Sequence, residues 1–280
     1  MKRVIACIDS SPCINALAEA AAWIATQTHR ELVLLQVLDY YPASYHLGEI
    51  SGVIGFESNA MLLKELAELE QKQSELAVDY SNNLLKHISD SIQSKHHIQT
   101  TTIQCKGDFL EQSFGILDPE DIVVIGRVGE RSAEKKKALG GNVENFIRGA
   151  NCTVMTVGEH FKPPTRFIFA YEYSPTCQKM MKRIAQSDLL RLLQCHLLYV
   201  GDHPSILKDP EEFLKNAGID VVTEYRYGDV AENILAYQEE HGIQLIVLGA
   251  YSHSKIHQFF LGSITTTIFR NSKVPLLVAK

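Results

Sequence analysis

The chain has 280 residues, enough for two domains with separate hydrophobic cores. Hydrophobic residues make up 45% and charged residues 21%, a balance typical of folded proteins and unlike that of disordered ones. The formal net charge is −6 and no dense lysine–arginine cluster occurs, which argues against a nucleic-acid partner. No apolar run is long enough to predict a signal peptide or a membrane span.

The first part of the chain predicts strands and helices in alternation. The β-branched run VIACID ends at Asp9 and predicts a strand, and Ser11 precedes a proline and an amphipathic helix pattern, which predicts a helix N-cap. Another apolar run follows and ends at Val37. After it come a long helical segment, a strand ending in Gly107-Asp108, a helix, the apolar run DIVVIG, a loop, a helix and the last strand, CTVMTV.

The second part of the chain repeats this order. Glu172 and Ser174 match Asp9 and Ser11 at an offset of 163, and Gly228-Asp229 matches Gly107-Asp108 at an offset of 121. Strands that are apolar on both faces and alternate with helices are typical of a parallel sheet covered on both sides. We therefore expect an α/β protein of two tandem open-sheet domains, 1–158 and 166–280, joined where Pro163-Pro164 interrupts regular structure.

The two halves differ in length at one place. From Val37 to Gly107 there are 70 positions, whereas from Val200 to Gly228 there are 28. The extra 42 residues predict a helical insertion at about 40–80, in which leucines keep helical spacing (Leu62, Leu66, Leu69 and Leu76). The helix either packs on its own domain or covers the other half or a partner.

Three features of each half meet at one sheet edge, because parallel strands end together and ligands bind beyond their carboxyl ends. They are the acid after the first strand, the end of the second strand and the glycine loop after the fourth. Gly249 allows the chain to leave its strand tightly, and Gly262 and Ser263 precede a helix whose N–H groups favour an anion. Asp9 and Glu172 are alternatively plain strand-end caps that face solvent.

The duplicated halves, the strand-end acid followed by serine and the spacing G-x2-G-x9-G-[S/T] together resemble the universal stress protein family. The likeness covers nearly the whole chain apart from the insertion, and the order of motifs is more specific than the glycine spacing alone. It implies a tandem member, with two family domains of a Rossmann-like, adenine nucleotide alpha hydrolase-like fold.

In this family some members bind ATP and others do not. In the binders the strand-end acid and the end of the second strand hold the adenosine, and the glycine loop holds the phosphates. The resemblance assigns these roles, with Mg²⁺ accompanying ATP, to two sets of residues. In the second half they are Glu172, Val200, Gly249, Ser252, Gly262 and Ser263. In the first half they are Asp9, Val37, Gly126, Gly129, Gly140 and Gly141.

The chain departs from the family pattern in both loops. Ser252 replaces a glycine, and a positive φ there costs about 1–2 kcal/mol, or a 5- to 30-fold loss of affinity. Glu172 is longer than the usual aspartate, and the first-half loop has one extra residue and no serine or threonine. We still expect an adenine nucleotide as ligand, bound as a signal or hydrolysed slowly. The alternative is an interaction scaffold with degenerate loops.

The residues themselves predict no catalytic set. Ser10, Ser11 and Ser263 lack a visible base partner, so that we expect at most a weak ATPase. His253 and His257 lack a third ligand, and no metal site is predicted. The six scattered cysteines form no CxxC pair, which favours reduced thiols in a cytoplasmic protein.

The resemblance also bears on assembly. Family domains commonly pair through their last strands, here CTVMTVG and PLLVAK. An apolar edge strand needs such cover. We expect the two halves to pair as an intramolecular pseudo-dimer. A homodimer of chains is a further alternative.

Overall fold

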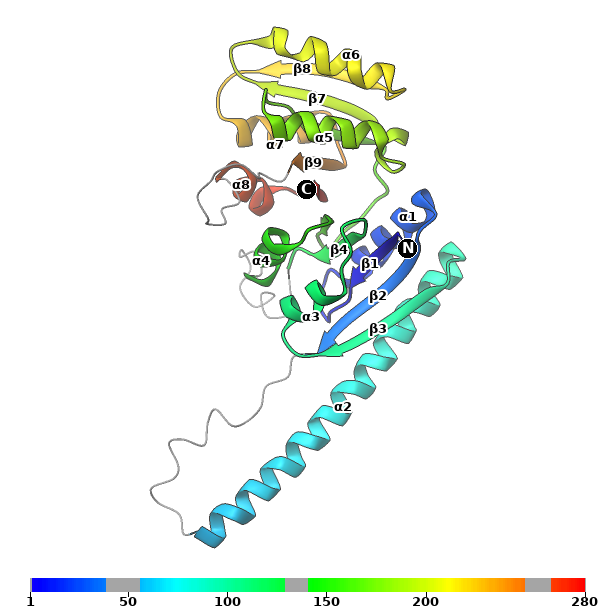
Figure 1. Ribbon diagram of the computed structural model, residues 1–280, viewed down its shortest axis with the longest axis vertical. Coiled ribbons are helices and arrows are strands. Elements are labelled where there is room, and N and C mark those ends of the chain that lie inside the picture. Colours follow the sequence, from blue (N-terminus) through cyan, green and yellow to red (C-terminus); the bar gives the residue numbers. More distant parts are fainter. Residues whose placement is uncertain (1, 39–55, 129–140, 250–262, 280) are drawn as a thin grey trace.

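The structure is a computed structural model that describes residues 2–38, 56–128, 141–249 and 263–279. Within these ranges the side chains of 56–63, 141–142 and 263 are not described. The two halves of the chain lie one beyond the other, with the first half at the bottom of Figure 1 and the second at the top.

The first half alternates strands and helices as its sequence predicts. Its elements are β1 (Arg3–Cys7), α1 (Ile14–Thr28), β2 (Glu31–Leu38), α2 (Phe56–His96), β3 (Thr100–Lys106), α3 (Phe109–Ile116), β4 (Ile122–Gly126), α4 (Gly141–Gly149) and β5 (Thr153–Val157). Residues 158–165 then connect to the second half without helix or strand.

The second half repeats the order with shorter connections. Its elements are β6 (Arg166–Ala170), α5 (Pro175–Gln186), the 3-10 helix η4 (Leu190–Leu192), β7 (Gln194–Val200), the 3-10 helix η5 (Pro204–Leu207), α6 (Lys208–Asn216), β8 (Val221–Arg226), α7 (Val230–Glu240), β9 (Leu245–Gly249), α8 (Ser263–Asn271) and β10 (Leu276–Ala279).

The described strands form one sheet in the order β3-β2-β1-β4-β5-β10-β9-β6-β7-β8. Side chains of successive strand residues point to opposite faces, so that Val4 and Ala6 join the core under α1, α2, α5 and α6, while Ile5 joins the core under α3, α4, α7 and α8. The sheet is therefore buried on both sides, which explains why its strands are apolar throughout.

The two halves are joined by their last strands. β5 and β10 pair antiparallel, with Thr156 opposite Leu276, Met155 opposite Leu277 and Val154 opposite Val278. The strand pairs within each half are parallel. The predicted intramolecular pairing of the halves is confirmed, and each of these apolar strands is an inner strand of the sheet.

The repeated Gly-Asp pair has a structural role in both halves. Gly107 and Gly228 take φ angles of +138° and +103°, which side chains other than glycine rarely adopt. The following aspartates are helix N-caps: Asp108 accepts from the N–H groups of Leu110 and Glu111, and Asp229 accepts from that of Glu232. The motif ends a strand and starts a helix.

Alanine at Asp108 or Asp229 should lower the melting temperature by about 2 °C in each case, because a lost N-cap costs about 1 kcal/mol. Calorimetry on the whole chain measures this shift. Glu212→Ala, which removes an exposed acid inside α6, is the matched control and should leave the melting temperature nearly unchanged. A control that melts as early as the cap variants would contradict the assignment.

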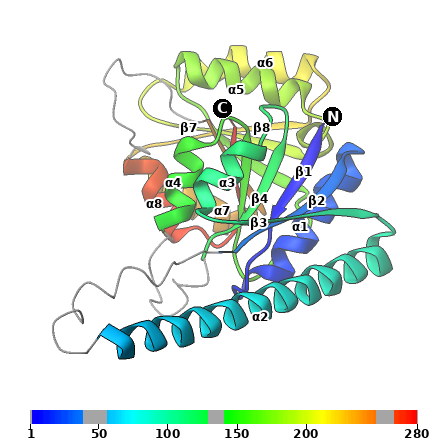
Figure 2. The same ribbon diagram turned by 60° about the horizontal axis from the view of Figure 1, so that its bottom comes forward.

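Helix α2 (Phe56–His96) begins and ends about 16 residues later than the helical insertion predicted at about 40–80, and the buried side chains of its described part lie toward its C-terminal end. Leu85, Ile88 and Ile92 are buried against the first half, so the helix does pack on its own domain. The leucines that mark the helix in the sequence lie elsewhere: Leu69 and Leu76 are 57% and 69% exposed. Figure 2 shows the N-terminal part of α2 running past the sheet.

The six cysteines are free thiols, and all but the half-buried Cys105 are buried. None of the helices in the described ranges combines the length and the apolar character needed to cross a membrane.

Candidate functional site

The strand order of each half reverses at one point, and the candidate site lies there. In the second half the chain adds β7 and β8 on one side of β6 and then places β9 on the other side. Ligands of open parallel sheets bind beyond the carboxyl ends of the strands at such a reversal. The corresponding point in the first half lies between β1 and β4.

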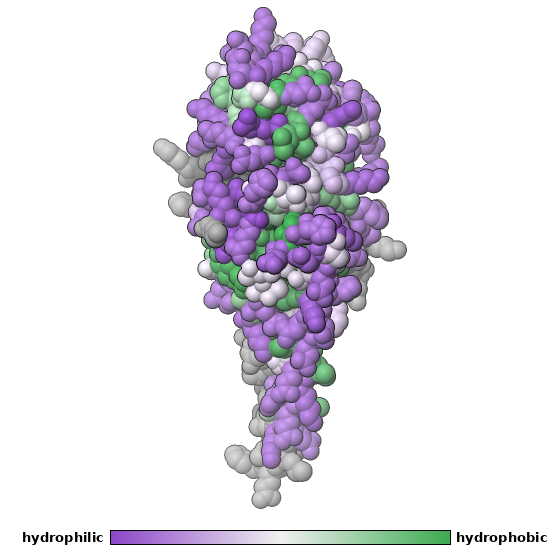
Figure 3. All heavy atoms as spheres, turned by 90° about the vertical axis from the view of Figure 1, so that its right-hand side faces the viewer, coloured by the Kyte–Doolittle hydropathy of each residue, from purple (hydrophilic) through white to green (hydrophobic). Residues whose placement is uncertain are grey.

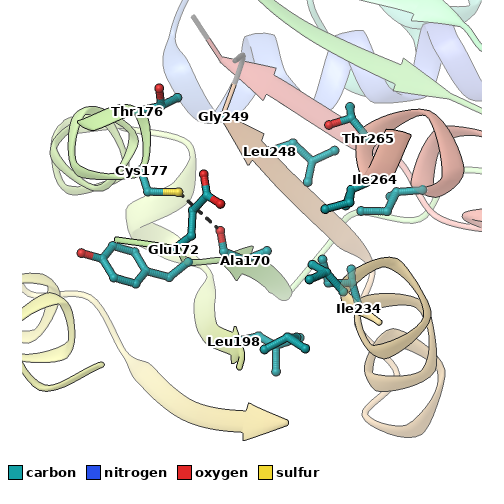
Figure 4. A pocket seen from close by; sticks show the side chains of 14 residues that line it. Ala170, Glu172, Thr176, Cys177, Leu198, Ile234, Leu248, Gly249, Ile264 and Thr265 are labelled. Carbon is teal, nitrogen blue, oxygen red and sulfur yellow. Dashed lines mark hydrogen bonds between the residues drawn. The ribbon is translucent and has the colours of Figure 1, made fainter. Parts of the chain in front are cut away.

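A pocket opens at this point in the second half (Figure 4). Its volume is about 110 Å³, which is room for several water molecules. The walls are mostly aliphatic, and the side chains with polar atoms are those of Tyr171, Glu172, Thr176, Cys177 and Thr265. The lining residues come from β6 and the two residues after it, and from β7, β9, α5, α7 and α8. They are Ala170, Tyr171, Glu172, Thr176, Cys177, Leu198, Val200, Val230, Ile234, Leu248, Gly249, Ile264, Thr265 and Ile268.

Three predicted site residues meet in this pocket: Glu172, Val200 and Gly249. Glu172 follows β6 and directs its carboxylate toward the middle of the pocket (Figure 4). The described residues form no hydrogen bond to this carboxylate, so its oxygens can accept from a ligand hydroxyl. Val200 ends β7 and contributes an apolar wall.

Gly249 is a close-packing position. A Cβ at this position would lie 3.2 Å from Cγ2 of Thr176 on α5. Gly249 is not among the glycines with positive φ, and the residues that follow it lie outside the described part of the chain, so its expected role in a tight exit from the strand stays a prediction. The absence of a side chain brings the N-terminus of α5 close to the end of β9 and keeps the pocket open between them.

Cys177 lies in the pocket as a neutral thiol. Its Sγ lies 3.8 Å from the carbonyl oxygen of Ala170, to which it donates. Burial raises the pKa of Cys177, so the thiolate is disfavoured at neutral pH. A nucleophilic role for this cysteine is therefore disfavoured.

The first half places Asp9, Val37 and Gly126 at the corresponding strand ends. Here the acid is engaged by its own loop, because an Asp9 carboxylate oxygen accepts from the N–H of Ser11 at 3.1 Å. Gly126 is also a close-packing position, since a Cβ there would lie 3.2 Å from Cβ of Cys13. The Asp9 carboxylate thus holds the loop after β1 through Ser11, in addition to lying at the sheet edge where a ligand would bind.

The helix N-cap predicted at Ser11, and by the repeat at the matching Ser174, has different outcomes in the two halves. Ser174 is confirmed as the N-cap of α5, because its Oγ accepts from the N–H of Cys177 at 3.2 Å. The prediction that Ser11 is an N-cap is wrong, because α1 begins only at Ile14, with Cys13 in the N-cap position. An extra turn precedes the helix, and Ser11 is 2% exposed with no partner for its hydroxyl among the described residues.

Several predicted loop residues lie outside the described part of the chain. These are Gly129, Gly140, Ser252 and Gly262, together with His253 and His257. Helices α4 and α8 begin at Gly141 and Ser263, so each glycine loop leads into a helix N-terminus as predicted. The described residues contain no group of three or more histidines, cysteines or acids placed to hold a metal ion.

Arg127, directly after Gly126, is an important residue that the sequence motifs did not single out. Its guanidinium crosses to the second half and donates to the carbonyl oxygen of Ser272 and, at 2.6 Å, to that of Val274. Burial lowers the pKa of Arg127, but an arginine stays charged at any physiological pH. The sequence does mark this position, because the two halves differ here: Arg127 follows Gly126, whereas Ala250 follows the matching Gly249.

Comparisons with known proteins agree with the duplicated fold. The model of the universal stress protein family matches residues 208–280. Over 285 residues the chain is 30% identical to Universal stress protein Slr1230 of Synechocystis sp. (strain ATCC 27184 / PCC 6803 / Kazusa), and the match covers 99% of both chains. It is also 31% identical over 75 residues to Universal stress protein YxiE of Bacillus subtilis (strain 168), covering 27% of this chain and 51% of that one.

Two solved structures share the fold over the whole chain. A universal stress protein from Archaeoglobus fulgidus DSM 4304 superposes with a TM-score of 0.73 at 19% identity, covering 99% of this chain and 98% of the other. A putative universal stress protein from Pseudomonas aeruginosa UCBPP-PA14 gives a TM-score of 0.63 at 13% identity, covering 100% and 93%. These likenesses concern the tandem architecture alone.

Proposed function

The chain belongs to the universal stress protein family, and we propose on this premise that its second half binds an adenine nucleotide, with ATP as the foremost candidate. The observation that carries the proposal is the pocket at the strand reversal, which brings Glu172, Val200 and Gly249 together. We further propose a cytoplasmic stress-response role in which the bound nucleotide acts as a signal.

The chemistry of the pocket suits a nucleoside. Aliphatic side chains from β7, α7 and α8 form walls against which a flat base can pack, among them Val200, Ile234 and Ile268. The Glu172 carboxylate is an acceptor for ribose hydroxyls, and hydrogen bonds to a charged group contribute about 1.5–3 kcal/mol. We propose that the base occupies the pocket and that the phosphates extend out of it toward the N-terminus of α8.

Helix α8 supports a site for these phosphates. It begins at Ser263, directly after the predicted glycine loop. The N-terminus of a helix offers unpaired N–H groups and a favourable dipole to an anion. Mg²⁺ would accompany the triphosphate, and slow hydrolysis is the most that we propose, since the pocket residues offer no activated nucleophile.

Mg-ATP should raise the melting temperature of the purified chain. At 10 mM ATP and a dissociation constant of about 1 mM, binding to the folded state contributes about 1.4 kcal/mol, or roughly 2–4 °C. Mg²⁺ with inorganic triphosphate at equal concentration controls for ionic effects. Adenine nucleotide recovered from heat-treated protein would add support, whereas an unchanged melting temperature at 10 mM ATP would favour a scaffold with degenerate loops.

A further inference from the structure

Helix α2 reaches well beyond the body of the protein. It has 41 residues, which corresponds to a length of about 60 Å. Leu85, Ile88 and Ile92 are buried in the first-half core near its C-terminal end. Its N-terminal part, residues 56–80, extends away from the sheet (Figures 1 and 2), and we call this part the stem.

The rotation of α2 about its axis is fixed where it leaves the body. Ser81 is fully buried and donates to the side chain of Gln36 on β2. Gln104 on β3 donates in turn to the Ser81 hydroxyl. Because this chain of polar contacts holds one helix face against the sheet, the direction in which every other face points is also set.

A second apolar face points away from the body. Leu69, Leu76 and Tyr80 are 57%, 69% and 59% exposed. At 100° per residue, their side of the helix lies roughly 120° from the buried face. Apolar side chains stand out on the otherwise polar stem in Figure 3. We define the outer stripe as the six positions Leu66, Leu69, Gln73, Leu76, Tyr80 and Asn83.

The outer stripe has the spacing of a coiled-coil seam, since its positions alternate in steps of three and four. Free-standing helices with an exposed leucine seam are stabilised by pairing, because packing against a partner supplies most helical stability. We propose that the outer stripe binds the outer stripe of a second copy of this chain, with the two α2 helices antiparallel about a two-fold axis.

The charged residues beside the outer stripe favour a second copy of this chain as the partner, and they favour one alignment of the two helices. Lys72 and Asp79 are exposed and flank the same side of the outer stripe. When Gln73 of one copy faces Leu76 of the other, Leu69 faces Tyr80. The same alignment places Lys72 of each copy opposite Asp79 of the other, so that two ion pairs form by symmetry.

Other alignments juxtapose like charges. An antiparallel pairing shifted by one heptad, with Leu66 facing Leu76, brings Lys72 against Lys72 and Glu65 against Asp79. In a parallel pairing, a residue just before one stripe position faces the residue five positions later in the partner. Glu65 of one copy would therefore face Glu70 of the other. The charge pattern of the stem therefore favours the antiparallel dimer described above.

Sedimentation equilibrium of the full chain tests the proposal. The wild type, of 31.4 kDa, should sediment as a dimer in the micromolar range. Leu69→Glu/Leu76→Glu should raise the dimer dissociation constant at least 100-fold, whereas the matched double variant Ala67→Glu/Gln71→Glu, with the same added charge off the stripe, should leave the dimer intact. Circular dichroism checks that both variants keep the helical content of the wild type.

Charge exchange tests the register. Lys72→Asp should weaken the dimer about tenfold, because two attractive pairs become repulsive, and Lys72→Asp/Asp79→Lys should restore it to within about threefold. A wild type that stays monomeric at 100 µM would overturn the proposal and leave the stripe to a different partner. A dimer that survives the two glutamates, or a charge variant that is not rescued, would equally overturn it.

Discussion

Glu172→Ala should weaken ATP binding by about 10- to 100-fold. Its carboxylate is the acidic group of the pocket and is positioned to accept from ribose hydroxyls, and loss of hydrogen bonds to a charged group costs about 1.5–3 kcal/mol. Glu172→Gln keeps the shape but removes the charge, and it should lose part of this affinity. Because Glu172 is exposed at the pocket mouth, neither variant should alter the melting temperature of the unliganded chain by more than about 1 °C.

The duplication supplies the control for this variant. Asp9 occupies the matching position in the first half, where its carboxylate accepts from the N–H of Ser11. Asp9→Ala should leave ATP affinity nearly unchanged if the second half carries the nucleotide. Equal affinity of wild type and Glu172→Ala, or a loss confined to Asp9→Ala, would contradict the assignment of the site to the second half.

Arg127→Ala should lower the free energy of unfolding by about 2–3 kcal/mol. The guanidinium bridges the two halves through the carbonyl oxygens of Ser272 and Val274, and its removal leaves both carbonyls without this donor. Thermal and urea unfolding measure the loss. We expect the two halves to unfold less cooperatively in this variant, because the contact lies directly beside the β5–β10 seam.

Arg30→Ala is the matched control for Arg127→Ala. Arg30 also donates to a backbone carbonyl, that of Glu120, but this contact is exposed and lies within the first half. Its loss should cost less than about 1 kcal/mol. If Arg30→Ala destabilises the chain as much as Arg127→Ala does, the bridge between the halves has no special importance.

The fold was predictable because several independent signals agreed. Strands apolar on both faces predicted a parallel sheet, and the matched offsets predicted its duplication. The apolar character of CTVMTV and PLLVAK favoured their pairing, which the register of Val154, Met155 and Thr156 against β10 confirms. The strand patterns report burial and the offsets report duplication, and their agreement is what made the fold predictable.

The candidate site was predictable only in outline. Glu172, Val200 and Gly249 meet because strand ends meet, and topology alone gives that result. The helices α7 and α8 add Ile234 and Ile268 to the pocket, and these look like ordinary core residues in the sequence. The loop positions that would complete the anion site, Ser252 and Gly262, lie outside the described residues.

Other features depended on tertiary context. Ser11 and Ser174 both precede proline, yet only Ser174 is a cap, because the first half inserts an extra turn before its helix. The leucines of α2 keep helical spacing, but spacing does not reveal which face meets the body. Arg127 was missed because a lone arginine carries no motif, although the departure from the repeat at this position marked it.

Calorimetric titration of ATP in the presence of Mg²⁺ tests the central claim most directly. Wild type should bind one nucleotide per chain with a dissociation constant of about 1 mM or below. Gly262→Val should bind at least tenfold more weakly, because the sequence predicts that a phosphate approaches the backbone at Gly262, where an added side chain would block it. If both proteins bind ATP equally, or neither binds it, the second-half pocket is not a nucleotide site.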